Sequence, residues 1–510
     1  MSKPLSPLYW PSLISLLAAK LAIHLYANTL WGFHRDEFLY LSLGRHLDWG
    51  YWSNPPFIGW VSALIQATAG DSLFAIRLFP MLVSGALLVL VVLMARELGG
   101  GRYAQFLAGA AMLLTPANLR PGMLFMPVMP DIFFWALLAY LVIRYINTGH
   151  RRDILLFGLV FGLSFLNKYA TGFALLGMAG ALLLSPYRKV LWSRDAALAA
   201  LIALVLILPN LIWQYQHNFP VVAHMQGLAE NQLVNVRIKD FLTGQLFMNL
   251  SVIPVWVAGL IWFFHPANRR YQVLGWYFVL VFLLLLVLRG KPYYTLGLYP
   301  MLIAAGGVWW ENLSRSVWLR VALPLFILLL LLPALPLGLP VLPLPLMKQY
   351  CTYLIDKAGF DGPMRWEDGE IHPLPQDYSD MLGWEELGQL AVKAYREAEG
   401  EDVLLYCENY GEAGAVDYYG KGQDIPPAVS FSDTYRLWLP HTTSAKTLIY
   451  INSELGEDVG QLFGDIRLVG AISNSDARER GTSVFLCRKP KADFGAFWAE
   501  RVRGVLSGED

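Results

Sequence analysis

Residues 76–98 read IRLFPMLVSGALLVLVVLMAREL, an apolar run with charged residues only near its two ends. A membrane-spanning helix needs about 20 mostly apolar residues, so this segment predicts a membrane span. Similar apolar blocks with short polar breaks extend from Leu8 to about Met347, after which the composition becomes that of a globular domain. Only 15% of the chain is charged, against about 25% in a typical soluble domain. The sequence therefore predicts a polytopic membrane protein with a soluble C-terminal part.

About eleven segments have the length and composition of membrane spans. They are residues 8–30, 76–98, 104–120, 131–147, 154–167, 169–185, 196–213, 242–264, 271–288, 295–310 and 318–346. We therefore expect a mainly α fold, with a transmembrane domain over residues 1–347 and a soluble domain over residues 348–510.

Positive charge in the short loops predicts the orientation of these spans. Lys and Arg gather in alternate loops, at Arg96 to Arg102, Arg144 to Arg152, Arg188 to Arg194, Arg269 to Arg270 and Arg315 to Arg320. This side is expected to be cytoplasmic, so the loops 31–75, 121–130, 214–241 and 289–294 lie outside. An odd number of spans from a cytoplasmic N-terminus also places the soluble domain outside the cytoplasm.

The soluble part reads as a small α/β domain. Apolar β-rich runs at 403–406, 447–451 and 483–486 alternate with amphipathic helical stretches such as 383–399 and 411–420. Its three cysteines include no CxxC pair, which argues against a disulfide framework or a zinc site. The net charge of the chain is zero, so nothing in the composition indicates nucleic-acid binding.

Carboxylates occur at two places that this topology puts on the outer face. Asp36 and Glu37 follow the first span directly, and Asp131 opens the fourth. Each pattern is also what an ordinary helix start shows, because acidic residues in a first turn complement the helix dipole. The functional alternative is that Asp36 is a general base held at the membrane surface.

Cations are expected on the same face. Lys168 separates the short fifth and sixth spans, and Arg289 and Lys291 precede Tyr293 and Tyr294 in the loop between the ninth and tenth. Lys and Tyr often serve only as interfacial anchors. Carboxylates and cations together, however, suit a reaction with a phosphate leaving group and an acceptor hydroxyl that must lose its proton.

Several motifs in this order resemble bacterial glycosyltransferase family 39, the dolichyl-phosphate-mannose-protein mannosyltransferase-like group related to the lipid A aminoarabinose transferase. The matching stretches are FHRDEFLYL at 33–41, WGY at 49–51, NPP at 54–56, MPD at 129–131, LNKY at 166–169, PNLIWQ at 209–214, GKPYY at 290–294, YP at 299–300 and NYGEAGA at 409–415. They are spread over nearly the whole chain.

The resemblance implies a GT-C-type helical bundle and an inverting transfer from a polyprenyl-phospho-sugar. Asp36 matches the catalytic acidic residue, with Glu37 beside it, and Asp131 matches a second outer aspartate. Lys168 and the loop from Arg289 through Lys291 to Tyr294 would then bind the donor phosphate.

The substrate loop implied by the resemblance contains His34, Arg35, Asn54, Pro55 and Pro56. Many relatives carry His where this chain has Asn54, which puts a role for that side chain, including metal binding, in doubt. The spacing of the histidines matches no known metal pattern. His34, His46 and His224 are side chains that can ligate a cation, so the sequence allows a divalent cation but does not indicate one, and we predict no metal and no cofactor.

The acceptor stays open at this stage, as a protein, a lipid or a polysaccharide, and so does the sugar, a hexose or a pentose. Another class of function is a transporter or flippase of lipid-linked sugars, which inverted repeats around a mid-membrane site would favour. An inactive scaffold is disfavoured because the Asp36–Glu37 pair is intact. The expected location is the bacterial cytoplasmic (inner) membrane, as a multi-pass protein.

The loop charges make a direct prediction of topology. A reporter that is active only outside the cytoplasm should be active when fused after Asp510, and a cytoplasmic reporter should be active when inserted within 149–153. The opposite pattern would reverse the orientation and remove the catalytic assignment with it.

Overall fold

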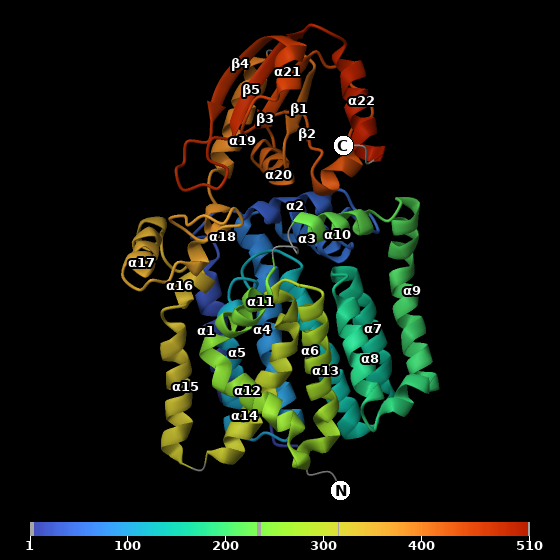
Figure 1. The fold of residues 1–510 in the computed structure, drawn as a ribbon, viewed down its shortest axis with the longest axis vertical. Helices are drawn as coiled ribbons and strands as arrows, with labels where there is room; N and C mark the ends of the chain where they lie inside the picture. The colour runs from blue at the N-terminus through green and yellow to red at the C-terminus, as the bar shows by residue number, and fades with distance from the viewer. Residues whose placement is uncertain (1–4, 232–235, 315, 399, 508–510) are drawn as a thin grey trace.

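The computed structural model describes residues 5–231, 236–314, 316–398 and 400–507. Figure 1 shows a helical bundle with a sheet domain standing on one end of it, and short helices lying between the two. The division follows the sequence, because the apolar segments form the bundle and the globular C-terminal segment forms the sheet domain.

The bundle contains the long apolar helices and several shorter ones. They are α1 (Trp10–Ala27), α4 (Leu73–Glu97), α5 (Arg102–Leu113), α6 (Val128–Thr148), α7 (Arg151–Asn167), α8 (Thr171–Leu183), α9 (Arg194–Gln216), α11 (Ile238–Met248), α12 (Ile253–Phe264), α13 (Gln272–Val287), α14 (Tyr299–Leu313) and α15 (Val317–Leu331).

Each predicted span overlaps at least one helix, but not every helix is long enough to cross a membrane alone. Among the described residues, five segments qualify by length and composition: α1, α4, α6, α9 and α13 together with the turn before it. A bent pair of helices would make a sixth if it forms one span. The predicted single span 242–264 is in fact two helices, α11 and α12, bent by 70° at a short break. The predicted span 318–346 is also too long, because its helix α15 ends at Leu331.

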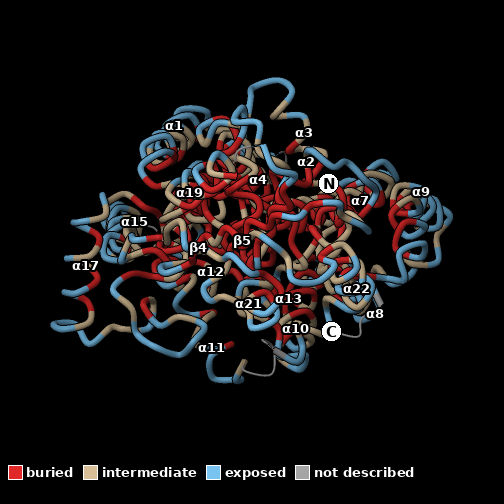
Figure 2. The backbone as a smooth tube through the Cα atoms, turned by 90° about the horizontal axis from the view of Figure 1, so that it is seen from above, coloured by how far each residue is buried: buried red, intermediate tan, exposed pale blue. Residues whose placement is uncertain are grey.

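The outer surfaces of the peripheral helices are apolar. Leu204, Val205 and Leu208 on α9 and Leu325 and Phe326 on α15 are all exposed. In Figure 2 the buried residues gather at the centre of the molecule, while α9 and α15 lie at its edge. Exposed leucines of this kind suit contact with lipid, as expected for helices of a membrane protein.

Helices α12 and α14 pack against one another through glycine. A Cβ added at Gly306 would collide with the backbone carbonyl of Val255, and one added at Gly259 would collide with the carbonyl of Leu302. Small residues at such contacts let the two backbones approach closely, which is a common way for membrane helices to associate.

Short helices lie where the bundle meets the sheet domain (Figure 1). They are α2 (Arg35–Arg45), α3 (Phe57–Ala69), α10 (Pro220–Asn231), α16 (Leu335–Gly338), α17 (Leu344–Asp356) and α18 (Gln376–Ser379). The predicted outer loop 31–75 is therefore largely helical.

The C-terminal domain is built on a five-stranded sheet of order β2-β1-β3-β5-β4. Its strands are β1 (Val403–Cys407), β2 (Ala428–Val429), β3 (Thr447–Asn452), β4 (Phe463–Ala471) and β5 (Ser483–Pro490). Strands β2 and β3 both pair with β1 in parallel, whereas β5 pairs antiparallel with β3 and β4. The expected α/β domain is thus observed.

Helices cover both faces of this sheet. On one face, α19 (Trp384–Glu397) and α20 (Tyr410–Tyr419) share a core with the sheet and with α2 of the membrane part. On the other face, α21 (Glu457–Leu462) and α22 (Phe494–Ser507) pack over residues such as Leu448 and Tyr450. Because α2 belongs to the same core as α20, the C-terminal domain is fixed on the bundle by apolar packing.

The glycine contact between α12 and α14 gives a stability prediction. Gly306→Ala should lower the unfolding midpoint of the purified protein in detergent, because overpacking a tight contact costs about 1–3 kcal/mol. Gly172→Ala, at a helical position with open space around it, is the matched control. It should be neutral or mildly stabilising, since alanine favours a helix over glycine by about 0.5–1 kcal/mol. Equal midpoints for the two variants would contradict the close packing.

Candidate active site

The N-terminus of α2 is held by a capping box. His34 is the N-cap; its Nδ1 accepts the backbone N–H of Asp36 at 3.1 Å, and Glu37 Oε2 accepts the N–H of His34 at 2.9 Å. Reciprocal caps of this kind satisfy the free N–H groups at a helix start. The helix-start interpretation of Asp36 and Glu37 is therefore correct for the backbone.

Glu37 is completely buried against Arg77 of α4. Arg77 Nε donates to Glu37 Oε1 at 2.9 Å and Arg77 Nη2 donates to Oε2 at 2.6 Å, while the N–H of Phe125 donates to Oε1 at 2.9 Å. Both side chains are 0% exposed. With both oxygens engaged and no access to solvent, Glu37 holds α2 in place, and the catalytic role expected for it does not fit this geometry.

Asp36 points the other way and meets the C-terminal domain. The hydroxyl of Tyr410, at the start of α20, donates to Asp36 Oδ1 at 2.7 Å. The guanidinium of Arg35 lies 4.7 Å from the centre of the same tyrosine ring. Burial and the negative charge of Asp36 raise the pKa of Tyr410 well above its usual value, so this hydroxyl stays protonated and donates. Asp36 is only partly buried, so the carboxylate is not closed off from solvent.

Asp131 and Lys168 are brought together by the ends of α6 and α7. The buried Asn167 amide donates to the carbonyl of Pro127 at 3.0 Å, which ties the end of α7 to the start of α6. The charges of Asp131 and Lys291 both act on Lys168. Asp131 itself is buried, and its Oδ1 has no hydrogen-bond partner in the described part of the chain.

Tyr293 joins this cationic cluster to Asp36. Lys168 Nζ lies 5.3 Å from the ring centres of both Tyr293 and Tyr294. The negative charge of Asp36 also acts on Tyr293, and Tyr293 is 37% exposed. The structure therefore gathers a partly exposed carboxylate, a lysine and two tyrosines at one end of the bundle, under the sheet domain.

Other predicted residues lie outside this cluster or support it. Arg289 is exposed, with a backbone φ of 53°. Asn54 donates to Ser53 Oγ at 2.7 Å, and Pro55 and Pro56 are buried where the chain turns into α3. Asn54, Pro55 and Pro56 thus shape the loop, and none of them has a contact here that points to substrate.

His34 belongs to a charged junction with the C-terminal domain. Its Nε2 and carboxylate oxygens of Asp377 and Asp380 lie within 4.8 Å of one another, a spacing that could hold a metal ion. Both carboxylates already face arginines, however: Asp377 pairs with Arg120, and Asp380 lies 3.1 Å from Arg478. Two arginines beside the group oppose a further cation, so we interpret it as an ion-pair junction.

Sequence reasoning missed Tyr410 and Tyr40 as members of the site. Tyr410 lies within the stretch 409–415, which was noted for its resemblance but given no role. A contact between residues 374 positions apart has no local sequence signal. Tyr40 follows Asp36 by one helical turn, and this spacing alone could have placed both on one side of α2.

Comparison with known proteins identifies the fold. The family model for dolichyl-phosphate-mannose-protein mannosyltransferases matches residues 53–213, a region that contains Asp131 and Lys168 but begins after Asp36. The structure of ArnT from Cupriavidus metallidurans bound to undecaprenyl phosphate has a TM-score of 0.61, with 15% identity, over 93% of this chain and 97% of that one. The archaeal oligosaccharyltransferase AglB from Archaeoglobus fulgidus has a TM-score of 0.50, with 13% identity, over 87% of this chain and 69% of that one. The chain thus has the GT-C fold.

Two glycosyltransferases are similar in sequence to parts of this chain. The lipid A galacturonosyltransferase RgtD of Rhizobium johnstonii is 29% identical over 265 residues, 50% of this chain and 54% of the relative. The undecaprenyl phosphate-alpha-4-amino-4-deoxy-L-arabinose arabinosyl transferase of Pseudomonas paraeruginosa is 31% identical over 199 residues, 34% of this chain and 35% of the relative. The matches thus span about half or less of these relatives' length. The predicted kinship with the lipid A aminoarabinose transferases is confirmed.

Proposed function

We propose that this protein is a membrane glycosyltransferase that moves a sugar from a polyprenyl-phosphate donor to an acceptor hydroxyl. The observation that carries the proposal is that residues 125–127 contact both parts of the site. The N–H of Phe125 donates to Glu37, next to Asp36, and the carbonyl of Pro127 accepts from Asn167, next to Lys168, so that a base and a phosphate-binding group lie at one end of the bundle. The relatives support the donor class, since one acts with an undecaprenyl-phosphate sugar and a structure of the same fold binds undecaprenyl phosphate.

In this proposal Lys168 and Lys291 receive the donor phosphate. When the bond between the anomeric carbon and the phosphate oxygen breaks, negative charge grows on the departing lipid phosphate. Preorganised cations and hydroxyl donors stabilise such charge, and Tyr293 and Tyr294 beside Lys168 supply the hydroxyls. The phosphate leaves already anionic, so no strong general acid is required.

Asp36 then acts as the general base. It accepts the proton of the acceptor hydroxyl while the acceptor oxygen bonds to the anomeric carbon from the face opposite the phosphate, which inverts the configuration. Tyr410 holds Asp36 through Oδ1, which orients the carboxylate. The C-terminal domain is in this way part of the reaction site.

We infer that this end of the bundle faces away from the cytoplasm. The connection from α8 to α9, which contains Arg188 and Lys189, lies at the opposite end (Figure 1). Positive charge favours the cytoplasmic side of short loops. The lipid phosphate and the acceptor would then meet beneath an extracytoplasmic C-terminal domain.

The base assignment predicts the effect of Asp36→Asn. The amide keeps the size of the side chain but cannot accept a proton, so turnover should fall by a factor of about 10²–10⁴, with the unfolding midpoint unchanged. The assay is sugar transfer from a radiolabelled polyprenyl-phospho-sugar panel by purified protein. Asp48→Asn, an exposed carboxylate of the same outer loop, is the matched control and should keep full activity. A fully active Asp36→Asn variant would remove the base assignment.

The phosphate assignment predicts a defect in donor use for Lys168→Met. The change removes a charge and keeps the chain length, and charge-assisted hydrogen bonds are worth about 1.5–3 kcal/mol. The ratio kcat/KM for the donor should therefore fall roughly 10- to 100-fold. Lys189→Met, at an exposed site in the connection between α8 and α9, should leave it unchanged. If both variants use donor equally well, Lys168 serves only as an interfacial anchor.

A further inference from the structure

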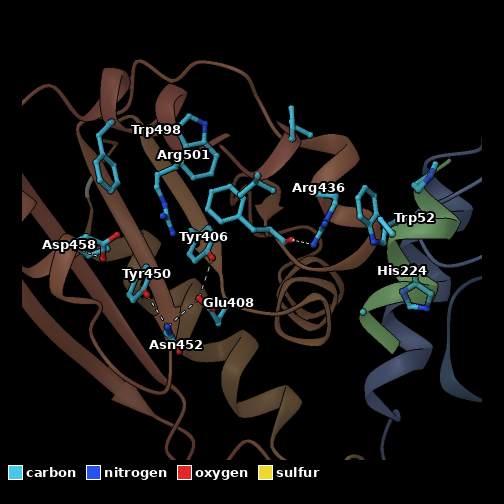
Figure 3. Close-up of a pocket in the computed structure, with 18 of the residues that line it drawn as sticks. Trp52, His224, Tyr406, Glu408, Arg436, Tyr450, Asn452, Asp458, Trp498 and Arg501 are labelled. Carbon is cyan, nitrogen blue, oxygen red and sulfur yellow. Dashed lines mark hydrogen bonds between the residues drawn. The ribbon is translucent and has the colours of Figure 1, made fainter. Parts of the chain in front are cut away.

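A large cavity lies between the membrane part and the sheet domain. Its volume is about 1130 Å³, slightly above the range of about 300–1,000 Å³ typical of small-molecule sites. Figure 3 shows Trp52 and His224 on one side, from the outer loop and α10, and Tyr406 and Tyr450 of the sheet opposite them. A cavity of this size suits a ligand larger than one sugar residue.

Sheet topology independently points to this position. Strand β1 lies between β2 and β3, and both are parallel to it. The chain therefore moves across the sheet in one direction from β1 to β2 and in the other direction from β2 to β3. In open α/β sheets, ligands bind outside the carboxyl ends of the strands at such a switch point. Glu408 directly follows β1, Phe431 comes just after β2, and Asn452 ends β3; all three line the cavity.

The walls carry flat aromatic surfaces. The rings of Tyr406 and Tyr450 are stacked, with centres 5.6 Å apart and planes at 8°, and those of Phe431 and Trp498 are stacked at 5.3 Å and 20°. The C–H groups on one face of a sugar ring are slightly positive and pack well on the negative face of an aromatic ring. Aromatic walls are therefore suited to sugar rings.

Hydrogen-bonding groups lie at the polar ends of the two tyrosines. The Tyr406 hydroxyl donates to Glu408 Oε2 at 3.2 Å, and Asn452 Nδ2 donates to the same oxygen at 3.2 Å and to the Tyr450 hydroxyl at 2.9 Å. Carboxylate, amide and hydroxyl groups together offer both donors and acceptors, which is what the hydroxyls of a saccharide need.

Arg436 contributes a cation to the opposite wall. Its guanidinium lies 4.0 Å from the centre of the Trp52 ring, and its buried Nε has no hydrogen-bond partner in the ranges that the structure describes. Its Nη2 donates to the carbonyl of Phe431 at 2.9 Å, which holds the guanidinium at the cavity wall. The cavity is therefore polar and aromatic on both sides.

Asp433 connects the cavity to the proposed reaction site. It accepts a hydrogen bond from Ser53 Oγ at 2.9 Å. Its charge acts on Tyr40 and Tyr410 next to Asp36, and also on His224 and Arg436 in the cavity wall. Glu408 of the cavity wall lies two residues before Tyr410, whose hydroxyl bonds Asp36, so a ligand against Glu408 lies near the residue that holds the proposed base.

We propose that this cavity binds the sugar rings of a saccharide acceptor, so that the acceptor is a glycan or the glycan part of a lipid and not a protein serine or threonine. The inference rests on the proposed function and specifies its acceptor. Trp52, Asn452 and Glu408 bind the saccharide and present one of its hydroxyls to Asp36.

The test is direct binding to the purified full chain by isothermal titration calorimetry. The probes are a neutral chitin trisaccharide, a galacturonate trisaccharide, a serine- and threonine-rich peptide, and a single-chain alkyl phosphate. We expect a trisaccharide to bind, and Trp52→Ala and Asn452→Ala to weaken that binding at least about tenfold, as truncation of a binding hot spot does. Trp192→Ala, an 84% exposed tryptophan outside the cavity, should bind as the unaltered chain does. Asp36→Asn should also retain binding, because it affects only the proton transfer.

The outcomes separate this inference from the proposed function. Binding of the peptide or the alkyl phosphate at Trp52 in place of a saccharide overturns the inference, and so does the absence of saccharide binding. If donor is turned over but saccharide binding ignores both cavity variants, the cavity assignment fails alone. If the variants lose saccharide binding but no polyprenyl-phospho-sugar is consumed, the proposed function fails and the cavity assignment stands.

Discussion

The buried ion pair between Glu37 and Arg77 is the contact on which the arrangement of the site depends. Besides Glu37, Arg77 donates to the carbonyls of Asn28 at 2.7 Å and Gly32 at 2.8 Å, so one guanidinium ties together the end of α1, the start of α2 and the middle of the bundle. A buried charge left without its partner costs about 3–5 kcal/mol. The position of α2, and of Asp36 with it, is therefore fixed by a contact that takes no part in the proposed chemistry.

Adjacent carboxylates on one helix acquire opposite environments in this way. Successive residues of an α-helix point about 100° apart, so when Glu37 faces inward to Arg77, Asp36 faces the C-terminal domain. Tyr410 then meets Asp36 from α20, whose start is capped by Asn409 through the N–H groups of Gly411 and Glu412. A strongly capped helix start in the C-terminal domain thus holds the hydroxyl that orients the proposed base.

The C-terminal domain does more than cover the bundle. Phe38 of α2 lies in the same apolar core as Trp384 and Ala413 of the domain, and the Asp380–Arg478 pair adds a polar junction beside His34. At this edge of the sheet, Glu408 directly after β1 lines the large cavity, and Tyr410 at the start of α20 contacts Asp36. This shared edge is why the proposed base and the proposed acceptor site are neighbours.

The sequence by itself determined the class of fold, the positions of the apolar helices, the α/β character of the C-terminal domain and the carboxylates and lysine of the candidate site. These depend on composition, local periodicity and short motifs. The sequence could not show that the segment 242–264 bends by 70°, because an apolar run looks alike whether or not it is straight. Nor could it separate Asp36 from Glu37, since both occupy the first turn of one helix. Only the tertiary structure decided that, through Arg77 and Tyr410, which approach α2 from distant parts of the chain.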